Sequence, residues 1–284
     1  MSEPASPRPR GALRGAWRAV QFTSVLLACI AHFLLARPRT LAARSRLRQQ
    51  WCARLLHVLG IKMRLEGEPP SHGVIVGNHL SYLDILVYGA VLDGVFVSKR
   101  EVKSWPLVGL ITRFAGTIYV DRTQRSDSAR VVDEMAAALA QGLTVTFFPE
   151  GTSTDGSSVM RFRAALFDAP LRTGDPIWPA GVTYTVEGKT DLVPEYVCYW
   201  GDMVFGPHVL NFLRLHDVAA VLHFAADPIY TATDRFDAAQ RSQAVVADLV
   251  GLPAVDTSAL PSLSQPEARP KESRISTETA STFN

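Results

Sequence analysis

The sequence predicts an α/β fold: a single domain with a mixed, largely parallel sheet flanked by helices, preceded by an N-terminal membrane-associating helix pair. From residue 61 onward, short apolar runs typical of strands alternate with stretches that have the 3.6-residue period of helices. Such alternation is typical of strands that lie side by side with helices on both faces. The length of 284 residues fits one domain, which we place at residues 61–250.

The expected elements follow one another with short connections. Strand-like runs lie at 62–65, 73–76, 95–97, 117–120, 144–148, 177–183 and 219–224. Helical patterns lie at 82–92, 106–114, 126–141, 163–171 and 236–249. After residue 250 the chain is rich in Ser, Thr and Pro and poor in bulky apolar residues, so residues 251–284 are expected to be a disordered tail.

The N-terminal region is basic and then apolar. Residues 1–15 are expected to be flexible, and residues 16–60 to form the helix pair. The run 19–36 contains no Asp, Glu, Lys or Arg and is close to the shortest helix that spans a bilayer. Arginines flank it on both sides, so the positive-inside rule gives no orientation, and a helix lying in the interface fits as well. A cleaved signal peptide is not expected, because Arg37-Pro38-Arg39 follows the run instead of a small-residue cleavage site.

The second helix of the pair, at 41–59, has an apolar face. Leu47, Trp51, Leu55 and Leu59 recur every four residues among arginines. This pattern fits a basic amphipathic helix at a membrane, which the neighbouring apolar run favours, or a surface helix packed on the domain. The formal net charge of +2 gives no general attraction to anionic surfaces. Three cysteines without a C-x-x-C pair indicate neither a disulfide framework nor a structural zinc site.

The most informative segment is residues 78–84 (NHLSYLD), directly after the predicted strand 73–76. Five residues on a regular helix turn through about 500°, which leaves two side chains roughly 140° apart. His79 and Asp84 would therefore not meet on one helix. We expect His79 in the loop, Ser81 as the helix cap and Asp84 in the first turn. From there the carboxylate can hold the imidazole in the tautomer that leaves one nitrogen free as a general base.

Asp84 also has a second interpretation. Ser81 and Asp84 have nearly the spacing of a capping box, in which a carboxylate accepts hydrogen bonds from backbone N–H groups. His79 could likewise be a loop histidine bonded to the backbone. The spacing leaves both interpretations open.

Four segments in this order resemble the glycerolipid acyltransferase family, which contains the lysophosphatidic acid (1-acyl-sn-glycerol-3-phosphate) acyltransferases. They are Asn78-His79-x-x-x-x-Asp84, residues 116–122 (GTIYVDR), 148–152 (FPEGT) and 177–182 (IWPAGV). The resemblance covers about residues 60–230. Its most specific part is the first and third blocks at their separation of 71 positions, from His79 to Glu150.

The resemblance implies transfer of a fatty acyl group from acyl-CoA or acyl carrier protein to a hydroxyl of a lysolipid, in membrane lipid biosynthesis. It implies His79 as the general base and Asp84 as its orienting carboxylate. The residues implied for substrate binding are Asn78, Arg122, Glu150, Gly151 and Thr152. Apart from the acyl donor as co-substrate, no cofactor is implied. No Gly-x-Ser-x-Gly elbow occurs, which favours direct attack over an acyl-enzyme.

One position departs from the common form of the family. Lysophosphatidate acyltransferases usually have an arginine directly after Glu-Gly-Thr, where it can pair with a phosphate, and this chain has Ser153. Residues 150–156 (EGTSTDG) and 199–203 (YWGDM) are instead similar to lyso-ornithine lipid acyltransferases. The acceptor is therefore open between lysophosphatidate and lyso-ornithine lipid. Other cations that could meet a phosphate are Arg122, the first choice, and Lys99, Arg100, Arg161 and Arg163.

Two other functions remain as alternatives: a catalytically silent lipid-binding or membrane-scaffold protein of the same fold, and an acyl-thioesterase. No metal is expected, because the histidines at 208, 216 and 223 have no thiolate or carboxylate at ligand spacing. No nucleic-acid partner is expected either, since the arginines bracket an apolar helix rather than an aromatic platform. The expected location is the membrane surface, with the catalytic domain on the cytosolic face.

Overall fold

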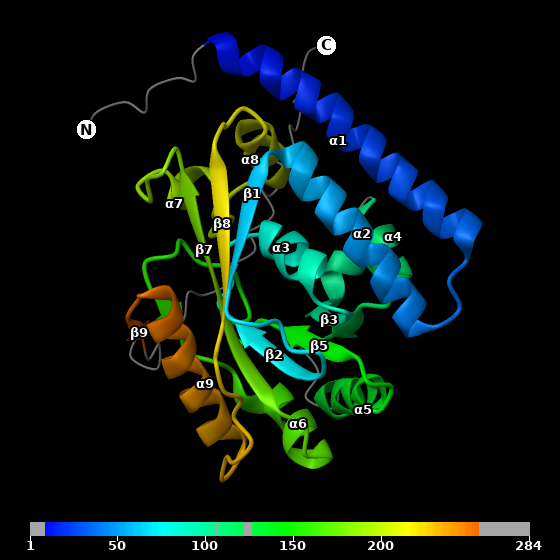
Figure 1. Ribbon diagram of the computed structural model, residues 1–284, viewed down its shortest axis with the longest axis vertical. Helices are drawn as coiled ribbons and strands as arrows, with labels where there is room; N and C mark the ends of the chain where they lie inside the picture. The colour runs from blue at the N-terminus through cyan, green and yellow to red at the C-terminus, as the bar shows by residue number, and fades with distance from the viewer. Residues whose placement is uncertain (1–8, 106, 122–126, 256–284) are drawn as a thin grey trace, which may run out of the picture.

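The computed structural model describes residues 9–105, 107–121 and 127–255 (Figure 1). Its strands are β1 (Ile61–Glu66), β2 (Gly73–Gly77), β3 (Gly94–Lys99), β4 (Ile118–Val120), β5 (Thr144–Phe147), β6 (Val159–Met160), β7 (Ile177–Val186), β8 (Val218–Phe224) and β9 (Ala254–Val255). Its α-helices are α1 (Pro9–Ala36), α2 (Leu41–Leu59), α3 (Leu83–Val91), α4 (Val108–Phe114), α5 (Asp127–Leu139), α6 (Asp168–Thr173), α7 (Val193–Tyr196), α8 (Phe205–Phe212) and α9 (Arg235–Val250). The α/β fold is confirmed.

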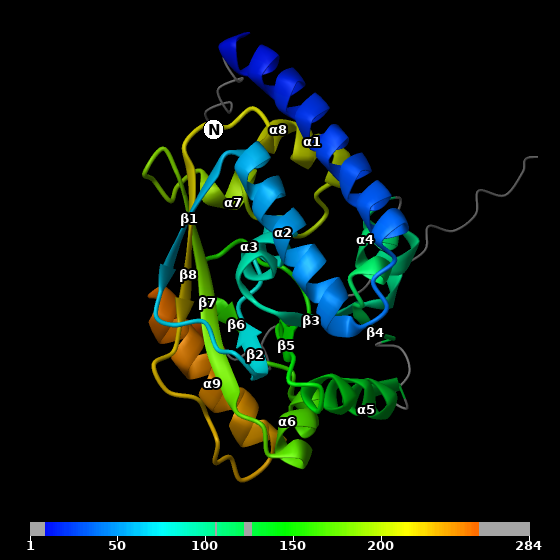
Figure 2. The ribbon, with the colours of Figure 1, turned by 45° about the vertical axis from the view of Figure 1, so that its right-hand side comes forward.

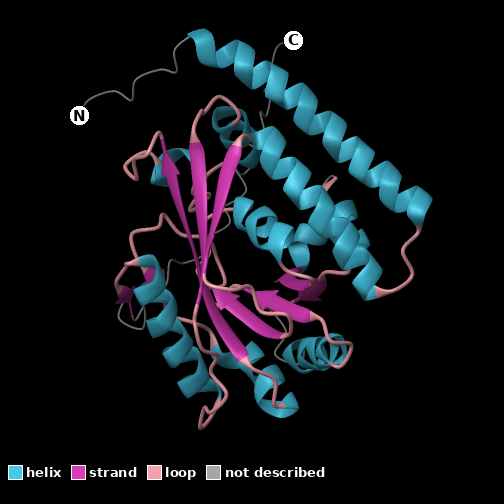
Figure 3. Cartoon of the chain, in the orientation of Figure 1, coloured by secondary structure: helices cyan, strands magenta, loops and turns pink. Residues whose placement is uncertain are grey.

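The main sheet has seven strands in the order β1-β8-β7-β2-β5-β3-β4. Figure 3 draws the strands in magenta between the cyan helices. Every neighbouring pair is parallel except β7 and β8, which are antiparallel. The predicted mixed, largely parallel sheet is therefore confirmed. β7 is long enough to pair with β2 through Ala180 and with β8 from there to Val186. β6 and β9 form a separate two-stranded sheet that the sequence pattern did not indicate.

Helices cover both faces of the sheet, and the side-chain alternation of β2 shows how. Ile75 packs with residues of α2 and α3 in one buried cluster, while Val74 and Val76 pack with residues of α5 and α9 in another. Successive strand residues point to opposite faces, so a strand that is apolar at every position is buried on both sides. Figure 1 shows α9 on the opposite side of the sheet from α2 and α3.

The N-terminal helices pack against each other, and α1 lies along the outside of α2 (Figure 2). Cys29 and Phe33 of α1 are buried with Leu47 and Trp51 of α2. The apolar face of α2 is thus covered by α1 and by the domain, so it lies in the core rather than at the surface. Packing on the domain, one of the two alternatives for this helix, is what the structure shows.

The outer face of α1 remains apolar and uncovered. Six large apolar side chains of α1 are exposed: Leu13, Trp17, Val20, Leu27, Leu34 and Leu35. The segment Gly11–Ala36 is long and apolar enough to cross a membrane by length and composition. This helix indicates membrane association, because a soluble domain rarely exposes such a continuous apolar surface.

Several local expectations need correction. Helix α3 begins at Leu83, and the Ser81 hydroxyl caps nothing because its buried oxygen has no hydrogen-bond partner. The predicted helix at 163–171 is a 3₁₀ turn at Ala164–Phe167 followed by α6. Between β3 and α4, for which no element was expected, lies a 3₁₀ helix at Arg100–Ser104. Helix α1 includes residues 9–15 of the expected flexible N-terminus. Residues 1–8, Arg122 and residues 256–284 lie outside the described residues.

Candidate active site

The candidate site lies where β2 and β5 end. These strands are parallel neighbours, so their carboxyl ends meet at the same edge of the sheet, which is where open α/β sheets bind ligands. His79 follows β2 by two residues and Glu150 follows β5 by three. Two segments separated by 71 positions are thereby brought into contact.

His79 and Asp84 form the predicted pair. The His79 Nδ1 atom is 2.7 Å from Asp84 Oδ2, and the Asp84 side chain is fully buried while that of His79 is 21% exposed. A carboxylate oxygen accepts hydrogen bonds, so the Nδ1–H of His79 donates a hydrogen bond to Asp84 Oδ2. This tautomer leaves Nε2 with a free lone pair. A nitrogen with a free lone pair, opposite an Nδ1–H held by a carboxylate, is the geometry that a general base requires.

Asp84 also has the capping role. Its Oδ2 atom accepts hydrogen bonds from the backbone N–H groups of Leu80 (2.7 Å) and Ser81 (2.9 Å) in addition to His79. Its Oδ1 atom accepts one from the Tyr184 hydroxyl at 2.8 Å. The same carboxylate therefore makes the contact with His79 and the capping contacts, because its two oxygens accept four donors.

The backbone and the ring of His79 are held by the segment after β5. The His79 N–H donates to Glu150 Oε1 at 2.8 Å, and the His79 carbonyl accepts from the Thr154 N–H at 2.9 Å. Phe148 stacks on the imidazole with a centroid distance of 4.4 Å and an angle of 6° between the rings. The third sequence block thus contacts the first one directly.

Glu150 is buried and its pKa is strongly shifted. The pKa of the Glu150 carboxyl is raised to about 8, mainly by burial. The hydrogen bonds from the N–H groups of His79 and Met160 act in the opposite direction, and the nearby Asp84 adds to the rise. Desolvation is the largest of these effects, since only 3% of the residue is exposed. Both Glu150 oxygens accept from backbone groups, at 2.8 Å from His79 and 3.3 Å from Met160.

Asn78 joins the loop to β7. Its Oδ1 atom accepts from the Val182 N–H at 2.8 Å and its Nδ2 atom donates to the Val182 carbonyl at 3.0 Å. The residue is 1% exposed. The side-chain amide of Asn78 therefore extends the hydrogen bonding between β2 and β7 by one residue, directly before His79.

The other residues expected in the site differ in placement. Gly151 has φ +79°, a conformation that favours glycine, and the Arg163 Nε atom would lie 2.8 Å from a Cβ at this position. Thr152 is exposed beside it. Arg122 is outside the described residues, so its predicted contact with substrate stays a prediction.

Two supporting residues were missed by the sequence analysis. Tyr184 lies in β7 after the fourth block, on the same strand face as Val182 and Val186. A tyrosine at an inward position of a strand needs a hydrogen-bond partner in the core, and that was the available signal. Phe148 belongs to the third block, but nothing in its spacing indicated that it would stack on His79.

Comparison with known proteins agrees with this geometry. Residues 60–183 match the family model described as Acyltransferase. A lyso-ornithine lipid O-acyltransferase from Rhodobacter capsulatus is 32% identical over 255 residues, which cover 86% of this chain and 91% of the relative. One from Pseudomonas aeruginosa is 34% identical over 60% of this chain and 65% of its own length. A 1-acyl-sn-glycerol-3-phosphate acyltransferase from Neisseria meningitidis is 33% identical over 51% of this chain and 61% of its own length.

A solved structure shows the same fold. The 1-acyl-sn-glycerophosphate acyltransferase from Thermotoga maritima superposes with a TM-score of 0.62 over 85% of this chain and 96% of that chain, at 18% identity. The family model and the relatives define the class as acyltransferase. The chain belongs to the acyltransferase family, within the class of lysolipid O-acyltransferases.

Proposed function

We propose that the protein transfers a fatty acyl group from acyl-CoA or acyl carrier protein to the hydroxyl of lyso-ornithine lipid, with His79 as the general base. The observation that carries the reaction type is the 2.7 Å contact between His79 Nδ1 and the buried Asp84. The observation that favours this acceptor is the environment of Ser153. Similarity to relatives named for both acceptors supports the reaction class.

The reaction follows from the geometry in two steps. His79 Nε2 takes the proton of the lipid hydroxyl as that oxygen forms a bond to the thioester carbonyl carbon. The tetrahedral intermediate then collapses, the C–S bond breaks, and the imidazolium returns the proton to the leaving thiolate. Asp84 stabilises the imidazolium between these steps, because its negative charge lies against Nδ1 in a buried setting. Within the described part of the chain, no serine or cysteine side chain bonds the ring.

The acceptor assignment rests on the position after Glu-Gly-Thr. The Ser153 hydroxyl donates a hydrogen bond to the Tyr199 carbonyl, so the two segments that resemble lyso-ornithine lipid acyltransferases touch each other. Relatives that act on lysophosphatidate usually place an arginine at this position. Ser153 offers no charge to pair with a phosphate.

A cavity beside Glu150 has room for the head group. Its volume is about 500 Å³, and it is lined by Glu150, Arg163, Gln240 and Gln243 among others. Ornithine carries a carboxylate and an ammonium group and no phosphate. The Arg163 guanidinium, next to Gly151, would pair with that carboxylate, and the amides of α9 would accept from the ammonium.

The proposal places the catalytic domain at the cytosolic face of the membrane, where acyl-CoA and acyl carrier protein are found. The exposed apolar face of α1 supports contact with lipid. Its inner face is packed against α2, so we assign α1 to the interface rather than to a span.

An acceptor panel tests the proposal. The purified chain is given acyl-CoA or acyl-acyl carrier protein with lyso-ornithine lipid, lysophosphatidate or no acceptor. We expect a higher kcat/KM for lyso-ornithine lipid. Product only from lysophosphatidate would contradict the acceptor assignment, and release of free fatty acid at the same rate without acceptor would show a thioesterase.

A charge-gain variant sharpens the test. Ser153→Arg supplies the missing guanidinium, and we expect it to raise kcat/KM for lysophosphatidate by about tenfold, the effect of one charge-assisted hydrogen bond. Ser158→Arg adds the same charge to the same loop and is the matched control. Equal effects of the two variants would show a general charge effect and count against Ser153 as the selective position.

A further inference from the structure

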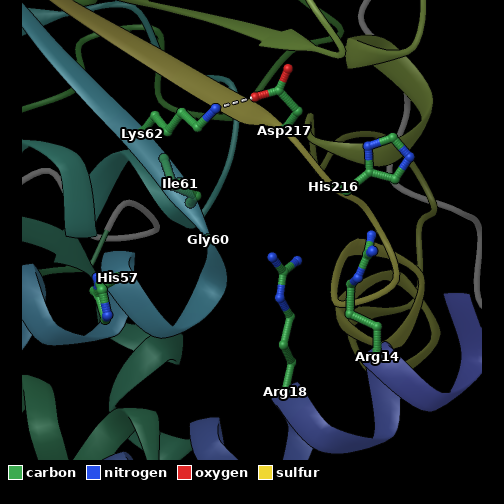
Figure 4. Close-up of a pocket in the computed structure, with 8 residues that line it drawn as sticks. All are labelled: Arg14, Arg18, His57, Gly60, Ile61, Lys62, His216 and Asp217. Carbon is green, nitrogen blue, oxygen red and sulfur yellow. Dashed lines mark hydrogen bonds and ion pairs between the residues drawn. The ribbon is translucent and has the colours of Figure 1, made fainter.

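A second cavity lies far from His79, between α1, the end of α2 and the beginnings of β1 and β8 (Figure 4). Its volume is about 700 Å³ and it is open to solvent. The side chains that line it are mostly cationic or can become so: Arg14, Arg18, His57, Lys62 and His216, with Asp217 as the one acid among the lining residues. Figure 4 shows Arg14 and Arg18 extending from α1 into the same space.

The acidic partners near the cavity are already engaged. Lys62 pairs with Asp217 at 2.6 Å, and His216 pairs with Glu187 at 2.8 Å. Within the described residues, Arg14 and Arg18 have no carboxylate partner. The cavity therefore brings two guanidinium groups together without an anion between them.

Arg18 is held in this position by the fold. Its Nη1 atom donates to the Leu215 carbonyl at 2.5 Å. Its Nη2 atom lies where a side chain of residue 60 would start, because a Cβ on Gly60 would be 2.1 Å away. Gly60 ends α2 with φ +71°, so this glycine both terminates the helix and admits the guanidinium. Burial and the neighbouring Arg14 lower the pKa of Arg18.

The surroundings of the cavity indicate what kind of molecule would carry an anion into it. Leu13 and Trp17 flank Arg14 in the sequence and are 81% and 64% exposed on the outer face of α1. Tryptophan and leucine beside arginine are typical of a helix at the boundary of acyl chains and head groups. An anion in this cavity would therefore lie at the head-group level of a membrane contacted by α1.

The cavity is separate from the active site. Asn78, next to His79, bonds Val182, whereas Val218 at the start of β8 pairs with Val186, four positions further along β7. At about 3.3 Å per strand residue, the two places lie about 13 Å apart along the sheet. None of the residues that line the cavity hydrogen-bonds His79 or Asp84.

We propose that this cavity binds the phosphate group of an anionic membrane phospholipid, with Arg14 and Arg18 as its ligands. A guanidinium presents two N–H groups in a plane that matches two phosphate oxygens, which a lysine ammonium cannot do. Lys62 and His57 complete the rim. The bound lipid is neither donor nor acceptor of the acyl group; it anchors α1 to the domain and to the bilayer.

The test uses variants that keep the charge. In Arg14→Lys/Arg18→Lys the net charge is unchanged and the planar fork is lost. The full chain is titrated with phosphatidylcholine vesicles that contain phosphatidylglycerol, and binding is followed by co-sedimentation. We expect the double variant to bind these vesicles about tenfold more weakly than the wild type. Arg39→Gln is the control for general attraction, since it removes an exposed charge at the other end of α1 and should cost at most about fivefold.

Two further measurements separate the sources of the anion. Inorganic phosphate is compared with chloride at equal ionic strength, and its effect on the Tm of the detergent-solubilised chain is recorded. A saturable rise in wild type that is lost in Arg14→Lys supports the phosphate chemistry. If phosphate gives that rise while the double variant binds vesicles normally, the ligand is a soluble phosphate compound and the lipid assignment is wrong.

Equal vesicle binding by wild type and double variant, with no phosphate effect, overturns the proposal altogether. Acyl transfer in detergent micelles should be unchanged in all three variants, because the cavity is remote from His79. This readout shows that the variants are folded and keeps the result independent of the acceptor proposal.

Discussion

Replacing Asp84 by asparagine separates its charge from its capping role. The amide oxygen of Asn can take the place of Oδ2, which accepts from His79, Leu80 and Ser81. The amide nitrogen would then face Tyr184, whose hydroxyl can turn and accept instead of donating. The local hydrogen-bonding geometry survives in Asp84→Asn, and only the negative charge is lost.

The expected magnitudes differ for stability and for catalysis. Hydrogen bonds to a charged group contribute about 1.5–3 kcal/mol and neutral ones about 0.5–1.5 kcal/mol, so four weakened bonds would cost about 4 kcal/mol. The amide avoids the cost of burying a charge, which offsets part of this loss and leaves about 1–3 kcal/mol. The imidazolium loses its counter-charge completely, so kcat should fall by about 10²–10⁴-fold.

The assay combines urea unfolding with acyl-transfer kinetics on the same preparation. His79→Ala is the matched control, because it removes the base and leaves the backbone donors to Asp84 in place. We expect Asp84→Asn to lose activity far beyond its fraction unfolded. If folded Asp84→Asn kept more than about a tenth of the wild-type kcat, the carboxylate would serve only as a helix cap and our account of the base would be refuted.

Three other substitutions test the surrounding contacts. Tyr184→Phe leaves one buried oxygen of Asp84 without a donor, and unfolding in urea should show a loss of about 1–3 kcal/mol with kcat reduced less than tenfold. Glu150→Gln tests how the stability of the folded protein depends on pH. The pKa of Glu150 is about 8 in the folded protein against 4.5 in the free side chain, so the folded state holds the extra proton and wild-type stability falls as pH rises between 5 and 8. The slope is about 1.4 kcal/mol per pH unit, and the glutamine variant should lack it, matching wild type near pH 5 and gaining on it toward pH 8. Phe148→Leu removes the ring stacked on His79, which should cost about 0.5–1.5 kcal/mol of stability and lower kcat more than it changes KM.

Each of these has an outcome that contradicts it. A hundredfold loss of kcat in Tyr184→Phe, about 2.7 kcal/mol of barrier, would mean that the hydroxyl acts in the reaction and not only on Asp84. Parallel stability curves for wild type and Glu150→Gln from pH 5 to 8 would show that the Glu150 carboxyl is ionised when folded. Unchanged kcat in Phe148→Leu would show that the imidazole needs no aromatic support.

The strands of the main sheet and the contact between His79 and Asp84 could be predicted from the sequence because both depend on local order. Short apolar runs mark buried strands wherever they pair, and the interval from His79 to Asp84 is fixed by the beginning of one helix. The reversed direction of β8 could not be predicted in this way, because strand direction depends on the route of the chain between β7 and β8. The partner of the apolar face of α2 was also unpredictable, since a periodic pattern defines a face but not what covers it.

The supporting contacts were missed for a related reason. Asn78 bonds Val182 across 104 positions and Asp84 bonds Tyr184 across 100. No spacing rule connects residues so far apart, and single polar residues in apolar strands have many possible partners. The cationic cavity combines residues of α1, α2, β1 and the segment before β8, so it too becomes visible only in three dimensions.

These same long-range contacts determine which part of the protein is completed first during synthesis. Helix α1 is complete at Ala36, but the environment of Asp84 is incomplete until Tyr184 has been added. At translation rates of about 5–20 residues per second, the interval is about 7–30 s. During that time the nascent chain exposes an apolar helix that can reach lipid, while the pair that would modify lipid has not yet formed. Each molecule can therefore be delivered to the membrane before it becomes active.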